Sequence, residues 1–199
     1  MQKVTRCIIT FAFQLGLVAT LLWSIGMSVA QETAVPGVTV LHGSDDPESI
    51  PMVEAYEGIV SGYLLGSSDR GTSFLVYRVG LRRKTAAELV SYARDGWRQV
   101  IVLKLSEADA ICADRENIQS KAVLVQRLKS ATERQDALRR RVYDGAFELL
   151  DETNARRFRR YVADYRSELT INSKDIERFV MESPDSLRTM IVNVCSFVD

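Results

Sequence analysis

The chain has 199 residues, with 26 Lys and Arg against 26 Asp and Glu, one His and 46% hydrophobic residues. This length suits one or two globular domains, and the composition excludes collagen, low-complexity disorder and a disulfide-dense miniprotein. Only one long apolar run is present, which excludes a multi-span membrane protein. The balanced charge gives no reason to expect nucleic acid as a partner.

The first 30 residues predict a secretory signal peptide. They combine two basic residues near the start, an apolar run over 7–27 and the small residues Ser28-Val29-Ala30 at the end. This order is typical of a signal that is cleaved after Ala30, so the mature protein is expected to be periplasmic or extracellular. The alternative is an uncleaved anchor, because the apolar run is long enough to span a bilayer. Membrane contact is expected only in that case.

Charge is unevenly distributed along the rest of the chain. Residues 31–69 hold seven acidic residues and no Lys or Arg, 70–166 hold 21 basic and 13 acidic residues, and 167–199 hold three basic and six acidic residues. We favour an arrangement in which the acidic ends pack near the basic middle, because most surface charge is simply solvated. An anion-binding middle segment is the alternative.

Two regions follow the predicted signal peptide. Residues 31–51 contain three of the four prolines and the only histidine, which predicts a flexible linker. Residues 52–199 carry helical periodicity and are expected to form a single all-helical domain, although Asp95-Gly96 should interrupt it. Within this domain 97–105 suits either a short helix or an isolated strand. We favour the helix, because no second convincing strand is available to pair with it.

The strongest helical signal covers residues 107–144. Core-type residues follow one another there in steps of three or four, with no Pro or Gly among them, and Ser106 can cap the start. The sequence therefore predicts an all-α helical bundle built on one long central helix (about 107–144), with shorter helices packed along it. Ile118, Val125 and Leu128 are expected on the buried face of this helix.

Shorter helices are expected after the long one. Asp151 can cap a helix over 152–169, Ser173 can cap another, and Ser183 followed by Pro184 can start the last. No repeat of 20–50 residues is present, which excludes a solenoid.

Two cysteines lie outside the predicted signal peptide. Two such residues commonly pair in an oxidising compartment, and each lies beside an apolar position of its own predicted helix. We therefore expect a disulfide bond between Cys112 and Cys195. The alternative is two buried, unpaired thiols. Redox catalysis is not expected, because neither cysteine belongs to a CxxC pair.

Residues suited to catalysis are scarce. The only histidine, His42, lies in the predicted linker with no second metal ligand or nucleophile beside it, and is expected to be solvated. The sequence contains no HExxH zinc motif, GxSxG nucleophile elbow or glycine-rich phosphate loop. It therefore favours a protein that is not an enzyme and needs no cofactor or metal. An enzyme whose site is not recognisable from sequence is the minority alternative.

The remaining candidate is a group of seven arginines within residues 139–160. Arg156, Arg157, Arg159 and Arg160 are the possible contact with an anionic envelope component or an acidic protein. A solvated, salt-laced helix face is the favoured alternative, because several of these arginines have an acidic residue four positions away.

The stretch over 149–154, LLDETN, resembles in outline the Leu-Thr-x-x-Gln motif of a family of periplasmic helical chaperones. It lacks the Thr and the Gln at their places, so it does not identify the chain as a member. The resemblance implies only that an exported helical protein can work by binding other chains. We expect an exported, non-catalytic binding or envelope-associated protein, whose partner is an unidentified protein or an anionic envelope component. A membrane-anchored version of the same protein is the alternative.

Overall fold

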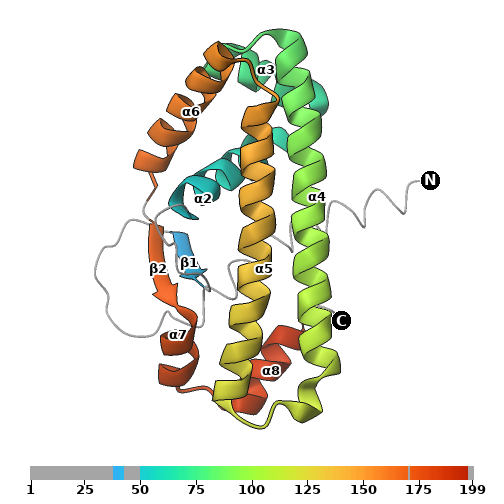
Figure 1. The fold of residues 1–199 in the computed structure, drawn as a ribbon, viewed down its shortest axis with the longest axis vertical. Helices are drawn as coiled ribbons and strands as arrows, with labels where there is room; N and C mark the ends of the chain where they lie inside the picture. Colours follow the sequence, from blue (N-terminus) through green and yellow to red (C-terminus); the bar gives the residue numbers. More distant parts are fainter. Residues whose placement is uncertain (1–37, 43–49, 170, 197–199) are drawn as a thin grey trace, which may run out of the picture.

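A computed structural model describes residues 38–42, 50–169 and 171–196, so the predicted signal peptide lies outside the described residues. The described chain contains seven α-helices, a few short turns of other helical types and two strands (Figure 1). In chain order the elements are β1 (Val38–His42), α2 (Ile50–Ile59), the π-helical turn η1 (Val60–Leu64), α3 (Ser68–Phe74), the π-helical turn η2 (Leu75–Val79), α4 (Arg83–Ala113), the 3-10 turn η3 (Arg115–Asn117), α5 (Lys121–Glu148), α6 (Glu152–Ser167), β2 (Ile171–Asp175), α7 (Ile176–Glu182) and α8 (Leu187–Cys195).

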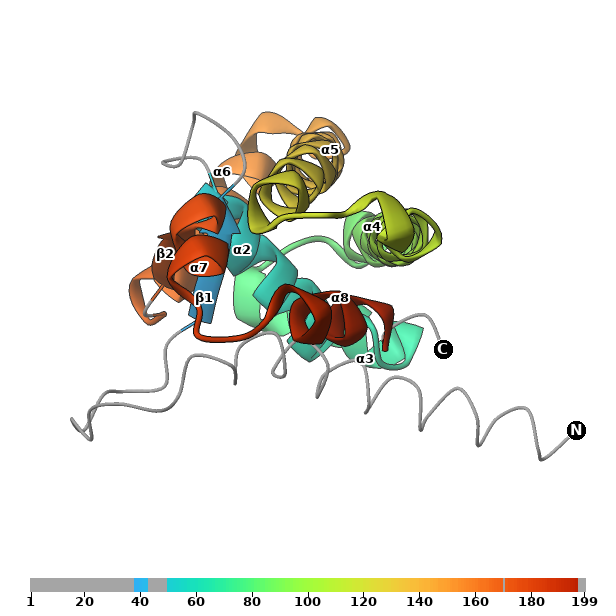
Figure 2. The ribbon, with the colours of Figure 1, turned by 90° about the horizontal axis from the view of Figure 1, so that it is seen from below.

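The all-α prediction is confirmed, and long helices form the centre of the bundle. Helices α4 and α5 run side by side in opposite directions, and the shorter helices pack along them (Figure 1). Helices α2, α3 and α6 surround one half of this pair, and α7 and α8 lie at the other half. Figure 2 shows α8 beside α4 and away from α5.

The bounds of the long helices differ from the prediction. The stretch 107–144 was expected to be continuous, but the chain turns between α4 and α5 over 114–120. Ile118 lies in this turn and is still buried, so its apolar side chain continues the helical pattern without being in a helix. Ser120 caps α5 by accepting a hydrogen bond from the Val123 amide at 3.3 Å.

Two further helix boundaries were also placed wrongly. Ser106 lies inside α4 and does not cap a helix, and its hydroxyl donates to the Leu103 carbonyl. The predicted break at Asp95-Gly96 is absent, because α4 continues through both residues. Residues 97–105 are helical, as expected.

The caps after α5 are partly as predicted. Asp151 does cap α6, accepting the Asn154 amide hydrogen bond at 2.9 Å. Ser173 lies in β2, and Asp175 caps the following helix instead. The last helix is capped by Ser186, since the chain at Ser183 is still extended.

A small sheet joins the start of the described chain to the segment between α6 and α7. Strand β1 pairs with β2 in parallel, with Val38 opposite Ile171 and His42 opposite Asp175. Strand β1 therefore lies within the stretch predicted as a linker. This pairing was not predicted, because each strand is only five residues long and neither shows a clear alternation of apolar and polar residues.

Glycine allows α4 and α5 to approach closely at one end. A Cβ atom on Gly96 would collide with the Val142 side chain, and one on Gly145 would collide with the Tyr92 ring. Away from this contact the two helices diverge, as Figure 1 shows. Gly96, which was expected to interrupt a helix, instead allows α4 and α5 to come into contact.

Two apolar clusters form the core. The larger one lies in the half of the bundle where α2 and α6 pack against α4 and α5, and Tyr56 and Phe158 are its largest fully buried side chains. The smaller one lies at the other half and joins α4, α5 and α7. Its buried members are Ile111, Ile118, Leu124, Val125, Ile176 and Val180. Leu128, expected to be buried, is half-buried and packs against this smaller cluster.

Candidate functional site: the cleft between α4 and α5

The predicted disulfide bond is present. Cys112 lies in the last turn of α4 and Cys195 is the last residue of α8, with their Cα atoms 5.4 Å apart. The bond is the covalent link that holds α8, which contains no fully buried residue, onto α4.

Replacing Cys195 by Ser is expected to lower the free energy of unfolding by roughly 2–4 kcal/mol, because the bridge restricts the unfolded chain over a long loop. Urea denaturation followed by circular dichroism measures this loss. Cys112→Ser is the matched control: it should cost the same, and the double variant should cost no more than either single one. Two titratable thiols in the unfolded, unreduced wild-type protein would contradict the bond itself.

The predicted arginine contacts are all exposed on α6, but three of the four are engaged within the chain. Arg156 pairs with Glu152 at 3.1 Å, and Arg157 donates to the Gly80 carbonyl at 2.7 Å. The guanidinium of Arg159 lies 5.1 Å from the centre of the Phe147 ring. Arg160 is exposed and makes no such contact with the described residues. None of the four lines the cleft described below.

A further arginine of the same sequence cluster is buried. Arg139 on α5 is 8% exposed and binds both carboxylate oxygens of Glu57, at 2.8 and 2.7 Å. It also contacts Asp136 at 2.8 Å and pairs with Glu54. One guanidinium therefore holds three carboxylates between α2 and α5.

Burial shifts the pKa values of this group. It raises the pKa of Glu57 from 4.5 to about 7, against the opposing charge of Lys104. It raises the pKa of Asp136 from 3.8 to about 6, although Arg140 and Lys104 oppose the shift. The pKa of Arg139 is lowered to about 10, so this side chain stays charged at neutral pH. These shifts are those of a buried ion cluster that joins two helices.

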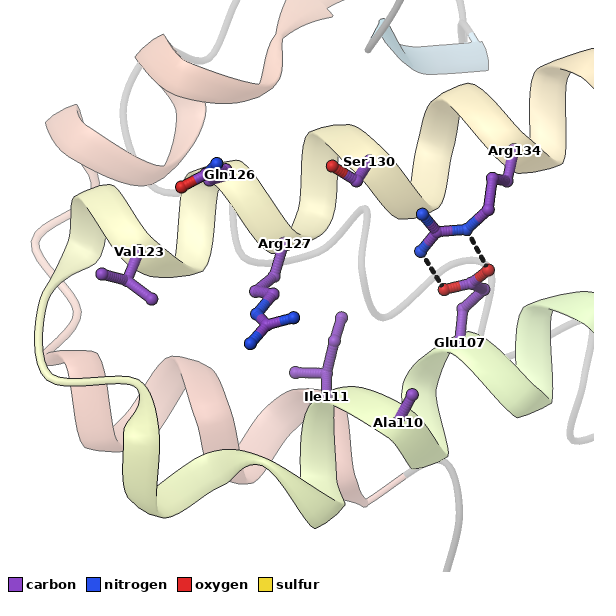
Figure 3. Close-up of a pocket in the computed structure, with 8 residues that line it drawn as sticks. All are labelled: Glu107, Ala110, Ile111, Val123, Gln126, Arg127, Ser130 and Arg134. Carbon is purple, nitrogen blue, oxygen red and sulfur yellow. Dashed lines mark hydrogen bonds and ion pairs between the residues drawn. The ribbon is translucent and has the colours of Figure 1, made fainter.

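An open space lies where α4 and α5 diverge. A cleft of about 440 Å³ separates the two helices near the disulfide end. Figure 3 shows the side chains that line it, which come from α5 along one wall and from α4 along the other. They are Val123, Gln126, Arg127, Ser130 and Arg134 from α5, and Glu107, Ala110 and Ile111 from α4.

Ion pairs bridge the cleft at two points. The Nε and Nη2 atoms of Arg134 each donate to one carboxylate oxygen of Glu107, both at 2.6 Å (Figure 3). These hydrogen bonds hold the pKa of Glu107 below its ordinary value. Nearer the turn, Arg127 pairs with Asp114, the residue that follows α4.

The position of the cleft follows from what holds α4 at each end. The glycine contacts draw α4 against α5 at one end, whereas the disulfide bond holds the other end of α4 against α8. Long Arg and Glu side chains span the resulting gap, because no pair of large apolar side chains fills it. The cleft thus lies between the glycine contacts and the disulfide bond that hold the two ends of α4.

None of these cleft residues was among the predicted site residues. Their spacing was a usable signal, because Val123, Arg127, Ser130 and Arg134 recur on one face of α5 in steps of three and four. These residues were predicted to share one continuous helix with residues 107–113. The prediction therefore could not show that the end of α4 faces α5 across a cleft.

Among the described residues, no group of His, Cys, Asp and Glu is arranged to hold a metal ion. Within the same part of the chain, no helix is both long and apolar enough to cross a bilayer.

Comparison with known proteins adds no relative: no family model, curated protein or solved structure matches the sequence.

Proposed function

We propose that the chain is exported and acts as a non-catalytic binding protein, with the α4–α5 cleft as its binding site. The observation that carries this proposal is the cleft itself. Its volume of about 440 Å³ lies in the range of small-molecule sites, which often occur between the helices of bundles. Its walls combine three apolar side chains, those of Ala110, Ile111 and Val123, with five polar or charged ones.

Export is supported by two independent features. The first 30 residues have the order of a cleavable signal, and the domain carries a disulfide bond. Stable disulfide bonds form in oxidising compartments and are rare in the cytosol.

Export can be tested on the full chain expressed in its own host. Mass spectrometry of protein recovered from separated cell fractions is expected to find a mature N-terminus at Gln31 outside the cytoplasm. A membrane fraction holding the protein with Met1 would support the anchored alternative. Full-length protein in the cytosol would contradict export.

Binding in the cleft can be tested by blocking it. Ala110→Trp places a large ring between the walls, whereas Ala137→Trp makes the same change at an exposed position of α5 outside the cleft. Native mass spectrometry of protein purified from its host is expected to show a bound small molecule on wild-type and Ala137→Trp protein, and its loss from Ala110→Trp. Equal occupancy in both variants, or no bound species on the wild type, would contradict the proposal.

A further inference from the structure

We infer that the α4–α5 cleft binds a small amphipathic anion, with a carboxylate or phosphate head on Arg127 and an apolar tail along Ile111 and Val123. This inference rests on the proposed function and names the ligand class of the same site.

The α5 wall of the cleft is a line of hydrogen-bond donors. Arg127, Ser130 and Arg134 lie at positions i, i+3 and i+7, which places them on one face of the helix, and Gln126 lies beside them. Arginine carries only donors, in a planar fork that matches the oxygens of a carboxylate or phosphate. The polar chemistry of this wall therefore favours an acceptor with negative charge.

The two arginines differ in how strongly they are engaged. Arg134 is held by both oxygens of Glu107, so its fork is already occupied. Arg127 contacts Asp114 through Nη2 alone, and its Nε and Nη1 atoms have no partner among the described residues. Figure 3 shows the Arg127 guanidinium extending from α5 into the space between the helices. Arg127 is thus the cation that can receive a ligand.

Asp114 does not need Arg127 to remain hydrogen-bonded. Its Oδ1 atom accepts a hydrogen bond from the Asn117 side-chain amide at 2.5 Å. Its side chain is also 27% exposed, so water can solvate it. An anion can therefore take the place of Asp114 on Arg127 without leaving a buried, unpaired carboxylate behind.

Three of the side chains that line the cleft are apolar. Ala110 and Ile111 belong to α4 and Val123 to α5, and Val123 lies nearest the turn (Figure 3). Ile111 belongs to the smaller apolar cluster, so this part of the cleft is continuous with the core. A ligand that is charged throughout would leave this surface without a partner, whereas a ligand with an alkyl tail would cover it.

Isothermal titration calorimetry with four probes tests this ligand class. Decanoate and decyl phosphate carry a head and a tail, decanol carries the tail alone, and inorganic phosphate carries a head alone. Decanoate or decyl phosphate is expected to bind wild-type protein at least about tenfold more tightly than decanol or phosphate, and the stronger of the two identifies the head. Equal binding of decanol and decanoate would overturn the inference.

Matched variants locate the head group. Arg127→Ala is expected to weaken binding of the preferred probe about tenfold, and Arg127→Lys to weaken it less, because the charge remains but the fork is lost. Arg141→Ala removes an exposed arginine of the same helix outside the cleft and should leave binding unchanged. Unfolding curves confirm that each variant folds. Equal affinity in Arg127→Ala and Arg141→Ala would overturn the assignment of Arg127.

The outcomes separate this inference from the proposed function. If none of the four probes binds but Ala110→Trp still loses the native bound molecule, the cleft is a binding site and the ligand class is wrong. If neither is observed, both the proposed function and the inference fail.

Discussion

Phe158→Ala is expected to lower the free energy of unfolding by about 3–5 kcal/mol. Phe158 on α6 is fully buried. The centre of its ring lies 5.3 Å from the centre of the Phe147 ring and 6.2 Å from the centre of the Tyr56 ring. Removing it would leave a cavity where α2, α5 and α6 meet, and close packing would let the surrounding rings collapse only in part.

Urea denaturation measures this effect, and Tyr77→Ala provides the matched control. Tyr77 is 83% exposed, so the same kind of truncation there should change stability by no more than about 0.5 kcal/mol. Similar losses in the two variants would mean that the aromatic cluster does not join α6 to the bundle as the structure shows.

Arg139→Met is expected to destabilise the protein by about 3–5 kcal/mol near neutral pH. The methionine fills much of the volume but leaves Glu54, Glu57 and Asp136 in the α2–α5 interface without their shared cation. Arg141→Met is the control, because Arg141 is an exposed residue of the same helix and should tolerate the change. A loss below about 1 kcal/mol in Arg139→Met would show that the carboxylates do not depend on Arg139.

The same cluster predicts how stability depends on pH. The pKa values of Glu57 and Asp136 are raised in the folded state, to about 7 and about 6, so the folded protein keeps protons that the unfolded chain releases from about pH 4 upward. Their contribution to stability is therefore fully present below about pH 4 and is lost as the pH rises to about 7.

Urea denaturation at pH 5 and pH 8 measures this effect. The contribution of Glu57 and Asp136 is expected to make the free energy of unfolding larger at pH 5 than at pH 8. Glu57→Gln cannot titrate at this position and should flatten the dependence. In Arg139→Met the decline with pH should steepen, because ionisation of the acids is then opposed more strongly. Identical pH profiles for the wild type and Glu57→Gln would contradict the raised pKa of Glu57.

Sequence patterns predicted the helical class and the disulfide bond, because neither prediction requires knowledge of how the helices pack. Helical spacing of apolar residues identifies a helix face wherever a helix exists, and two cysteines outside the predicted signal leave one possible pair. The Asp151 cap was predicted for the same reason, since a cap depends on the residues beside it.

The turn between α4 and α5 could not be predicted from periodicity. Ile118 keeps the expected spacing and is buried, yet it packs against the smaller cluster from a turn. The turn contains no Pro or Gly, and only the Ser120 cap marks it. Gly96 was wrongly predicted to interrupt a helix. It lies inside α4, where it packs against Val142 of another helix, and sequence spacing does not reveal that contact.

The cleft is a property of two helices together, which explains why the analysis of one helix at a time missed it. The four arginines selected on α6 form a dense group in the sequence, but three of them satisfy neighbours within the chain. Arg127 stands apart from that group, and only the divergence of α4 from α5 makes its position notable. A dense group of arginines in a sequence does not indicate which arginine keeps unpaired hydrogen-bond donors in the fold.

The pairing of β1 with β2 sets an order on the assembly of the molecule. Val38 pairs with Ile171 and Cys112 bonds to Cys195, so the two links can form only after β2 and α8 have been made. Closing such distant contacts costs chain entropy before they stabilise anything, and it slows folding. The contact of α2 with α6 also joins segments that lie far apart in the chain, so the half that holds α2, α3 and α6 forms only once α6 is available. A truncated copy that ends before β2 would lack both the partner strand of β1 and the partner of Cys112.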